Sequence, residues 1–359
     1  MLKNVLVDCE RMKYRYSGLA NVCRSLMAGF QYLSASGITL YGPKEILEQM
    51  SNLPIIPWRI FHKYFPANTF DFKVIHVTHQ LSSYFHKIRK NQKKIVTVHD
   101  LNFLHDQSKA RKVKKSTRLV QKNIGNADVL VFISDFVRQD FIKHQHLFKL
   151  NSNVVFEVIY NGLSFPEDKT FVAKRLDFLK KRKYILNIGV LHPKKNQMAL
   201  LELLKETNED LVLVASSKKE NFFDHFQKKM KIHGFEDRVH LLENVDEEEK
   251  YFLLQNCESY VHPSLAEGFG IPPVEAFFFQ KPVFLSRSTS LPEVGKHLAY
   301  YFDDFSADYM GEVYKKGMAD FRAKNSEERR QLQEHALQYG FVKMAEKYLM
   351  LYKKMLSST

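Results

Sequence analysis

The sequence of 359 residues predicts an α/β protein with two doubly wound domains, and two observations support this prediction. Short apolar runs alternate with helical or polar segments, a pattern typical of parallel sheets flanked by helices. The alternation pauses after residue 160 and restarts near residue 184. A hydrophobic content of 45% and a charged content of 26% are those of a globular protein, and the length suffices for two domains.

The first half begins with a strand, a loop and an amphipathic helix. Asn4–Asp8 is a short apolar run, and after Ser17-Gly18 apolar residues recur at helical spacing as far as Leu33. This is the start of a βαβ unit. Further strands are expected at Ile38–Tyr41, Val74–Thr78, Ile95–His99, Val129–Ile133 and Val154–Tyr160.

Two stretches depart from the alternating pattern. Residues 42–70 contain four prolines and the only tryptophan, and we interpret them as an irregular excursion that shapes an acceptor site. The charged segment between Gly162 and Lys183 contains Pro166 and is typical of a linker.

The second half repeats the strand and helix alternation. Strands are expected at Tyr184–Gly189, Leu211–Ser216, Val239–Leu242, Glu258–His262 and Pro282–Ser286. Helices are expected at Asn196–Lys205, Asn221–His233 and Asp246–Asn256. The result is a second Rossmann-like domain.

These patterns divide the chain into domains at residues 1–165 and 166–335, followed by a C-terminal helix at 336–359. The tail from residue 326 onward is helical in composition, and its apolar stripe needs a surface to pack against. We expect the terminal helix to cross back to the N-terminal domain.

Charge and cysteine content narrow the functional classes. Three scattered cysteines argue against a disulfide framework and for a reducing compartment. Neither a signal peptide nor an apolar run long enough to span a membrane is evident, so a cytoplasmic location is expected. The net charge is +14, with a basic stretch from Lys87 to Lys122 that would attract nucleic acid, an anionic membrane or a diphosphate-linked substrate.

The part of this stretch from Lys109 to Lys122 is helical in composition. A basic amphipathic helix is typical of membrane-surface binding, or of a site for a lipid-diphosphate acceptor. The alternative is a solvated basic surface.

The most informative motif is Glu267–Glu275, in the stretch HPSLAEGFGIPPVEA that starts at His262. A strand leads into a glycine-containing loop, and Pro272 and Pro273 predict the start of a helix. Backbone amides at such a helix start bind anions, and glycines let the backbone approach a phosphate closely. The two carboxylates are suited to accepting hydrogen bonds from sugar hydroxyls. The local chemistry therefore predicts a phosphorylated sugar compound, such as a nucleotide sugar.

This motif, followed by Pro282-Val283 and Ser290-Leu291-Pro292-Glu293, resembles the donor-site signature of retaining nucleotide-sugar glycosyltransferases. These are the "group 1" enzymes, glycosyltransferase family four, which have the GT-B fold. Ile188–Asn196, IGVLHPKKN, is similar to the Gly-x-Leu-x-x-x-Lys-Asn loop of that family. Weaker matches in the N-terminal half are Ser17-Gly18, Val96–His105, Ala127–Ser134 and Ile159–Gly162.

The resemblance implies roles for individual residues. Glu275 would bind the ribose, Glu267 would hold donor-sugar hydroxyls, and Lys195 would neutralise the leaving diphosphate. Gly18 would let the first loop approach that phosphate, and His99 would face the donor sugar and acceptor. Further donor contacts would come from Gly189, Ser216, Leu242, Asn244, Val245, Gly268, Phe269, Gly270 and Ile271. Residues 1–165 would then form the acceptor side and residues 166–335 the donor domain, facing each other across a cleft.

One position departs from the family pattern. Many members carry Arg after the glycine that matches Gly189, and this chain has Val190. Lys194 is the candidate for the second positive charge on the diphosphate.

The sequence also lacks an Asp-x-Asp motif after any predicted strand and a His/Cys cluster with zinc spacing. We therefore expect transfer without a metal or other cofactor. The resemblance implies retention by front-face attack, with the leaving phosphate accepting the acceptor proton.

Each candidate residue also has a structural interpretation. Glu275 could act only on the helix dipole, and Glu267 or Lys195 alone could be an ordinary surface residue. His99 could satisfy backbone groups, with Asp100 merely orienting it. Gly18 could serve as a helix-entry glycine.

Three functions remain open at this point. The first is a glycosyltransferase for a surface polysaccharide of lipopolysaccharide or capsule type, with a glycan or lipid-diphosphate-linked acceptor at the inner face of the cytoplasmic membrane. The second is another GT-B enzyme, such as a nucleotide-sugar epimerase or a phosphorylase. The third is a basic nucleic-acid-binding protein, which is not expected because no nucleic-acid module is recognisable. Mannose, glucose, N-acetylhexosamine and deoxysugar donors all fit.

Overall fold

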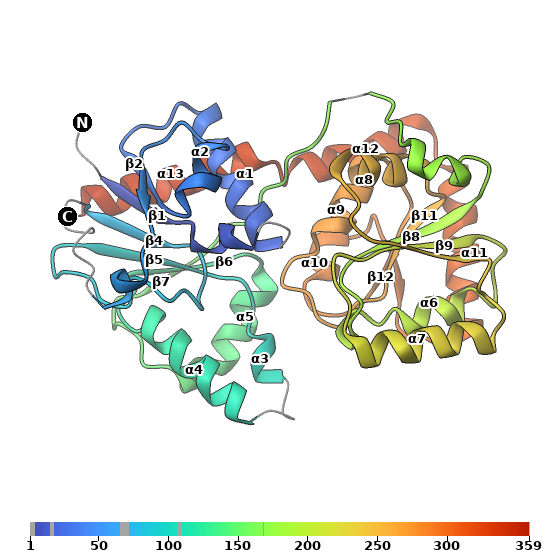
Figure 1. Cartoon of the computed structure of the whole chain (residues 1–359), viewed down its shortest axis with the longest axis horizontal. Helices are drawn as coiled ribbons and strands as arrows, with labels where there is room; N and C mark the ends of the chain where they lie inside the picture. Colours follow the sequence, from blue (N-terminus) through green and yellow to red (C-terminus); the bar gives the residue numbers. More distant parts are fainter. Residues whose placement is uncertain (1–3, 15–17, 65–71, 106–109, 168, 359) are drawn as a thin grey trace. The chain divides into compact units, whose positions relative to one another are not determined.

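The structure, a computed structural model, describes residues 4–14, 18–64, 72–105, 110–167 and 169–358 (Figure 1). The chain divides into two compact units, one made of Met1–Ser164 with Tyr339–Thr359, the other of Phe165–Gln338. Each unit is an open, parallel, doubly wound sheet, as the sequence predicts. Ser17 and Lys109, which belong to predicted motifs, lie outside the described residues.

The described residues of the first unit form a seven-stranded parallel sheet in the order β3-β2-β1-β4-β5-β6-β7. Its strands are β1 (Val5–Asp8), β2 (Ile38–Gly42), β3 (Ile55–Pro57), β4 (Val74–Val77), β5 (Lys93–Val98), β6 (Val129–Phe132) and β7 (Val155–Val158). Its helices are α1 (Gly18–Tyr32), α2 (Lys44–Glu48), α3 (Asn102–His105), α4 (Ala110–Ile124), α5 (Asp135–His144) and α13 (Phe341–Ser357). The strand order reverses between β1 and β4, which pair in parallel from Val5 with Val74.

The second unit has a six-stranded parallel sheet in the order β10-β9-β8-β11-β12-β13 among its described residues. The strands are β8 (Tyr184–Ile188), β9 (Asp210–Val214), β10 (Val239–Leu242), β11 (Ser259–His262), β12 (Val283–Ser286) and β13 (Tyr300–Phe302). The helices are α6 (Met198–Leu203), α7 (Glu220–Ile232), α8 (Glu247–Asn256), α9 (Ile271–Phe278), α10 (Leu291–Gly295), α11 (Ala307–Ala323) and α12 (Ser326–Leu337). Here the order reverses between β8 and β11.

The C-terminal helix α13 packs on α1 and on one face of the first sheet (Figure 1). Two of its tyrosines reach the sheet, because the Tyr348 and Tyr352 hydroxyls lie 2.9 Å from Thr97 Oγ1 and 2.6 Å from His76 Nδ1. Both rings are buried, so this surface covers the apolar stripe that the sequence shows in the tail.

The tail differs from the expectation at its start. It consists of two helices, α12 in the second unit and α13 in the first, separated at residues 338–340. Gly340 is extended there, and α13 therefore begins at residue 341 rather than at 336.

The expectation of an irregular excursion at residues 42–70 is wrong for its described part. Pro43 caps the short helix α2, and β3 adds to the sheet edge by pairing Ile55 with Leu40. The strand has only three residues, Pro54 precedes it and Pro57 is its last residue, so the sequence does not indicate a strand there. The expected linker is also partly structured, since residues 174–179 form a 3₁₀ helix whose Leu176 and Leu179 are buried.

Candidate active site

The switch point of the second sheet brings two predicted motifs together. Strands β8 and β11 are neighbours, with Ile185 paired to Ser259, and both end at the same edge of the sheet. The loop after β8 carries Lys195, and the loop after β11 carries Glu267. Ligands of open α/β sheets bind at this edge, outside the carboxyl ends of the strands where the order reverses.

The loop between β11 and α9 is held in a defined shape. Gly270 adopts φ +102°, a conformation that favours glycine, and the prolines that follow begin α9. Ser290 Oγ is within hydrogen-bonding distance of the Glu267 and Phe269 carbonyls, at 3.2 and 3.0 Å. The Glu267 amide donates to Thr289 Oγ1 over 3.0 Å. The segment before α10 therefore fixes the backbone on both sides of Gly268.

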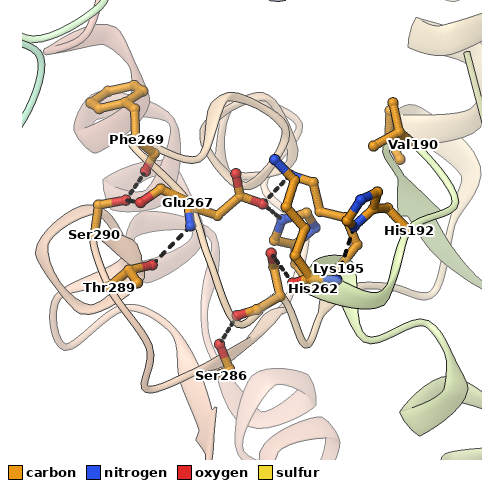
Figure 2. A network of polar contacts seen from close by, with 12 residues as sticks. Val190, His192, Lys195, His262, Glu267, Phe269, Ser286, Thr289 and Ser290 are labelled. Atoms are coloured by element: carbon orange, nitrogen blue, oxygen red, sulfur yellow. Dashed lines mark hydrogen bonds and ion pairs between the residues drawn. The ribbon is translucent and has the colours of Figure 1, made fainter. Parts of the chain in front are cut away.

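The Glu267 carboxylate is the centre of a polar network (Figure 2). Its Oε1 accepts a hydrogen bond from His262 Nε2 over 2.6 Å and pairs with the Lys195 ammonium. Burial raises the pKa of the carboxyl, but Lys195 and His262 outweigh it and hold the pKa well below its usual range. Among the hydrogen bonds between described residues, none ends on Glu267 Oε2. The Glu267 carboxylate is therefore charged, and its Oε2 is available for a ligand hydroxyl.

His262 is a buried donor at the end of β11. Burial lowers the pKa of its imidazole, and Glu267 only partly offsets this, so the ring is neutral near pH 7. Nε2 carries the proton that goes to Glu267, and Nδ1 lies 3.2 Å from the Tyr260 hydroxyl. The imidazole thus orients the carboxylate without bringing a second positive charge.

The loop that carries Lys195 is tied to the glutamate loop. The Lys194 carbonyl accepts from the Leu265 amide over 2.8 Å and from Ser264 Oγ over 3.2 Å. Buried Gln197 donates to the Val190 carbonyl over 2.8 Å. These bonds hold the lysine loop and the glutamate loop against each other.

Position 190 carries no charge, and the two lysines of the loop behave differently. The side chain of Lys195 is 15% exposed and its ammonium is paired with Glu267. The Lys194 ammonium forms no ion pair with a described residue, which leaves it available as a second cation.

Glu275 is placed in the first turns of α9, and a lysine from α8 holds it. Lys250 Nζ donates to Glu275 Oε1 over 2.7 Å. Burial lowers the pKa of Lys250, but the Glu275 carboxylate outweighs it and raises the pKa to about 12. Glu267 and Glu275 therefore share a pattern, in which one carboxylate oxygen engages a lysine from another element.

The other predicted donor contacts lie along the same edge of the second sheet. Ser216 follows β9 and is exposed, while Leu242 ends β10 and is followed by Asn244 and Val245. A Cβ added to Gly189 would lie 4.0 Å from Lys195 Cε, so this glycine lies beside the lysine. Phe269 is buried, so only its backbone can meet a ligand, and Ile271 is the first residue of α9.

The two predicted residues of the first unit are Gly18 and His99. Gly18 is the first residue of α1, and a Cβ placed on it would meet no described atom within 4 Å. His99 is buried, and its Nε2 donates to the Thr78 carbonyl over 2.9 Å. The Asp100 carboxylate accepts from the Asn102 amide over 3.0 Å and thus caps the following turn. Packing among the described residues thus does not require a glycine at position 18. His99 has at least a structural role, because it satisfies a backbone carbonyl.

Two residues of the site are missed by the sequence prediction, His262 and Lys250. His262 lies five residues before Glu267 and belongs to the same motif, so this contact could have been predicted from the sequence. Lys250 lies in a charged helix 25 residues from its partner, and no local pattern marks it.

Residues 168–339 match the family model described as glycosyl transferases group 1.

The matched segment coincides with nearly the whole second unit, including the Lys195 and Glu267 loops. Curated relatives of this chain are also glycosyltransferases by name. The O-antigen chain mannosyltransferase B of Escherichia coli is 27% identical over 226 residues, 58% of this chain and 57% of the relative. The O-antigen chain mannosyltransferase RfbU of Salmonella typhimurium is 26% identical over 217 residues, 60% of this chain and 58% of the relative. The matches thus span somewhat more than half the length of these relatives.

Solved structures confirm the predicted GT-B fold class. Anabaena HepE in complex with UDP and glucose has a TM-score of 0.75 at 17% identity, over 99% of this chain and 100% of that chain. Sucrose-phosphate synthase from Thermosynechococcus elongatus has a TM-score of 0.77 at 16% identity, with the same coverage. Both likenesses extend over the two units of the chain.

The described part of the chain lacks a membrane-spanning helix and a metal-binding cluster of side chains. None of its helices is both long enough and apolar enough to cross a bilayer. Within the same residues, no three His, Cys, Asp or Glu side chains are grouped so as to hold a metal ion.

Proposed function

We propose that this protein is a retaining, metal-independent glycosyltransferase of family four. It would move a sugar from a nucleotide-diphosphate donor to a glycan or lipid-linked acceptor in surface-polysaccharide biosynthesis. The observation that carries the proposal is the pair of carboxylates after β11, each held by a lysine, at the switch point of the second sheet. The group 1 family match and the O-antigen mannosyltransferases among its relatives support the same class.

The chemistry that each residue would supply follows from its contacts. Glu267 offers Oε2 to a donor-sugar hydroxyl while His262 and Lys195 hold Oε1. Glu275 offers Oε2 to ribose hydroxyls while Lys250 holds Oε1. Lys195, with Lys194 as the second cation, neutralises charge on the departing diphosphate, where a fixed cation in a water-poor site is most effective.

Support for a nucleotide-sugar donor also comes from structures of the same fold. HepE is described in complex with UDP-glucose, with a TM-score of 0.74 at 17% identity. For this chain we propose a nucleotide sugar as donor and leave the base to the experiment below. The roles of Gly18 and His99 remain predictions from the resemblance.

We also propose peripheral contact with the inner face of the cytoplasmic membrane through the basic segment from Lys87 to Lys122. In α4, the exposed basic side chains include Arg111, Lys112, Lys114, Lys115 and Arg118. An anionic surface attracts such a helix by roughly 1 kcal/mol for each basic residue near it.

The test is a thermal-shift screen against GDP-, UDP-, dTDP- and ADP-sugars, followed by a transfer assay with the stabilising donor and lipid-linked or glycan acceptors. We expect one nucleotide class to stabilise the chain and a product with the anomeric configuration of the donor. An epimerised donor without transfer would show that the chain is a different GT-B enzyme. Activity that disappears in EDTA and returns with a divalent ion would contradict metal independence.

A further inference from the structure

A second basic site lies in the first unit. It is a pocket of about 670 Å³, bounded by the segments 62–64, 85–87, 121–126 and 149–150. Its basic lining consists of His62, Lys63, His86, Lys87, Lys122 and Lys149. The segments 121–126 and 149–150 end a few residues before β6 and β7, so this part of the pocket lies towards the amino ends of these strands. The carboxyl edge of the same sheet, where His99 lies, is at the other end.

The four lysines of this pocket, Lys63, Lys87, Lys122 and Lys149, have no matching negative charges among the described residues. No described Asp or Glu lines it, and none of its four lysines forms an ion pair with a described residue. Like charges gathered in one concave site repel each other and raise the local concentration of anions. Within the described part of the chain, no negative charge therefore balances the positive charge of these four lysines.

A fifth lysine lies behind the lining. Lys94 is fully buried on β5, and its neighbour Ile95 packs in the core shared with α13, so Lys94 points to the opposite face of the sheet. Its Nζ donates over 2.9 Å to Oδ1 of Asn126, which lines the pocket. Burial lowers the pKa of Lys94 to about 7, since a neutral amide cannot replace a counter-ion.

Amide side chains join the walls of the pocket. The Gln121 side chain forms two hydrogen bonds with the Lys149 backbone. It accepts from the amide over 2.7 Å and donates to the carbonyl over 2.8 Å. Asn126 Nδ2 donates to the His86 carbonyl over 3.1 Å. Burial lowers the pKa of His86, and the positive charges of Lys94 and Lys122 lower it further. The two ammonium groups therefore lie close enough to the imidazole to affect it electrostatically.

We propose that this pocket binds a phosphate-bearing anion, either a soluble phosphoester or diphosphate or the headgroup of an anionic lipid. The ammonium groups would contact phosphate oxygens through charge-assisted hydrogen bonds, and the anion would supply the missing countercharge. The proposal does not depend on the proposed transferase activity, because every lining residue belongs to the first unit and the Glu267 network belongs to the second.

The test is calorimetric titration of the full chain with inorganic pyrophosphate, in a Lys195→Gln background that weakens binding at the second unit. Lys87→Gln/Lys122→Gln removes two pocket cations. Lys114→Gln/Lys115→Gln removes the same charge from exposed positions on α4 outside the pocket lining. We expect the pocket variant to bind roughly tenfold or more weakly and the control to bind within about twofold of the parent.

Two results would overturn the proposal. One is the absence of pyrophosphate binding in the Lys195→Gln background at physiological salt. The other is equal weakening by the two double variants, which would indicate a diffuse charge effect.

Vesicle sedimentation then separates the two sources of phosphate. One result is that pyrophosphate displaces the parent protein from phosphatidylglycerol vesicles but does not displace the pocket variant. The site then binds lipid headgroups. If pyrophosphate binds the pocket without affecting vesicle binding, the site takes a soluble anion. Both results support a phosphate site in the pocket.

Discussion

His262 donates a hydrogen bond to Glu267 over 2.6 Å, from the last residue of β11 to the loop that follows the strand. The same carboxylate oxygen meets Lys195, so a neutral donor and a cation share it. This sharing fixes the direction of Oε2, the oxygen that we assign to the donor sugar. In the proposed reaction, His262 would therefore act through the position of Glu267.

The first prediction concerns this hydrogen bond. His262→Phe keeps most of the ring volume and removes the donor, so we expect kcat to fall roughly tenfold to a hundredfold, as for loss of a hydrogen bond to a charged group. His262→Gln retains an N–H and should recover part of this loss. Thermal melting of both variants serves as the control for folding. Equal kcat values for the Phe and Gln variants would show that the hydrogen bond has no role in transfer.

The second prediction separates the two lysines after β8. Lys195→Ala should lower kcat by about a hundredfold to a thousandfold and change donor affinity less, because the role that we propose for Lys195 is to stabilise charge that develops on the leaving diphosphate. Lys194→Ala is the matched variant and should cost less than about tenfold, as expected for a cation without a fixed partner among described residues. Donor affinity is measured by titration and kcat under donor saturation. Unchanged turnover in Lys195→Ala would remove this lysine from the mechanism.

The third prediction uses the buried pair between α8 and α9. Glu275→Ala should weaken nucleotide binding by roughly tenfold and destabilise the fold by about 2–4 kcal/mol, because it leaves the Lys250 ammonium buried without a counter-ion. Adding Lys250→Met should restore the stability but not the affinity. Chemical denaturation and nucleotide titration measure the two effects separately. If the double variant regains affinity, Glu275 does not bind the nucleotide.

Most of the sheet could be predicted from the sequence, for a physical reason. Strands of parallel sheets are buried on both faces and appear as continuous apolar runs, as β6 with its four buried residues illustrates. The glycine and proline positions in the Glu267 loop also predict the strand, loop and helix that the structure contains. Lys195 and Glu267 meet because both follow strands at the switch point.

The remaining elements and contacts depend on packing that the local sequence does not reveal. β3 is a three-residue edge strand that follows Pro54 and ends with Pro57, and the sequence does not predict it. Helix α11 is also missing from the predicted elements, although its buried Met310 and Tyr314 recur at helical spacing. The Lys250–Glu275 pair joins two helices, and only their docking places the ammonium beside the carboxylate.

The fourth prediction distinguishes a functional glycine from a packing glycine. Gly18→Ala should leave stability within about 0.5 kcal/mol, since the added Cβ would meet no described atom within 4 Å, and should lower kcat roughly tenfold if phosphate approaches this turn. Gly162→Ala is the contrast, because its Cβ would lie 2.7 Å from Phe341 Cα at the start of α13. It should destabilise the fold by about 1–3 kcal/mol. Full activity in Gly18→Ala would assign this glycine to helix entry alone.

The fifth prediction concerns the buried Lys94 and the dependence of stability on pH. Its pKa is about 7 in the folded protein against the ordinary value of 10.5. Between these values the unfolded chain keeps the proton and the folded chain loses it, so Lys94 makes stability rise with pH across this window. Below the window both states are charged, and the folded protein bears the full cost of burying the ammonium.

Lys94→Met removes this cost and should therefore stabilise the protein most at low pH. The stability difference between the variant and the parent should shrink by about 2–3 kcal/mol from about pH 7.5 to about pH 9.5. Urea denaturation in a buffer free of phosphate measures it, with Lys114→Met on the exposed face of α4 as the control for charge loss. Saturating pyrophosphate should stabilise the parent more than the Met variant, because the anion compensates a charge that the variant lacks. A difference that is independent of pH would mean that Lys94 keeps its proton throughout the window, with a counter-ion already in place.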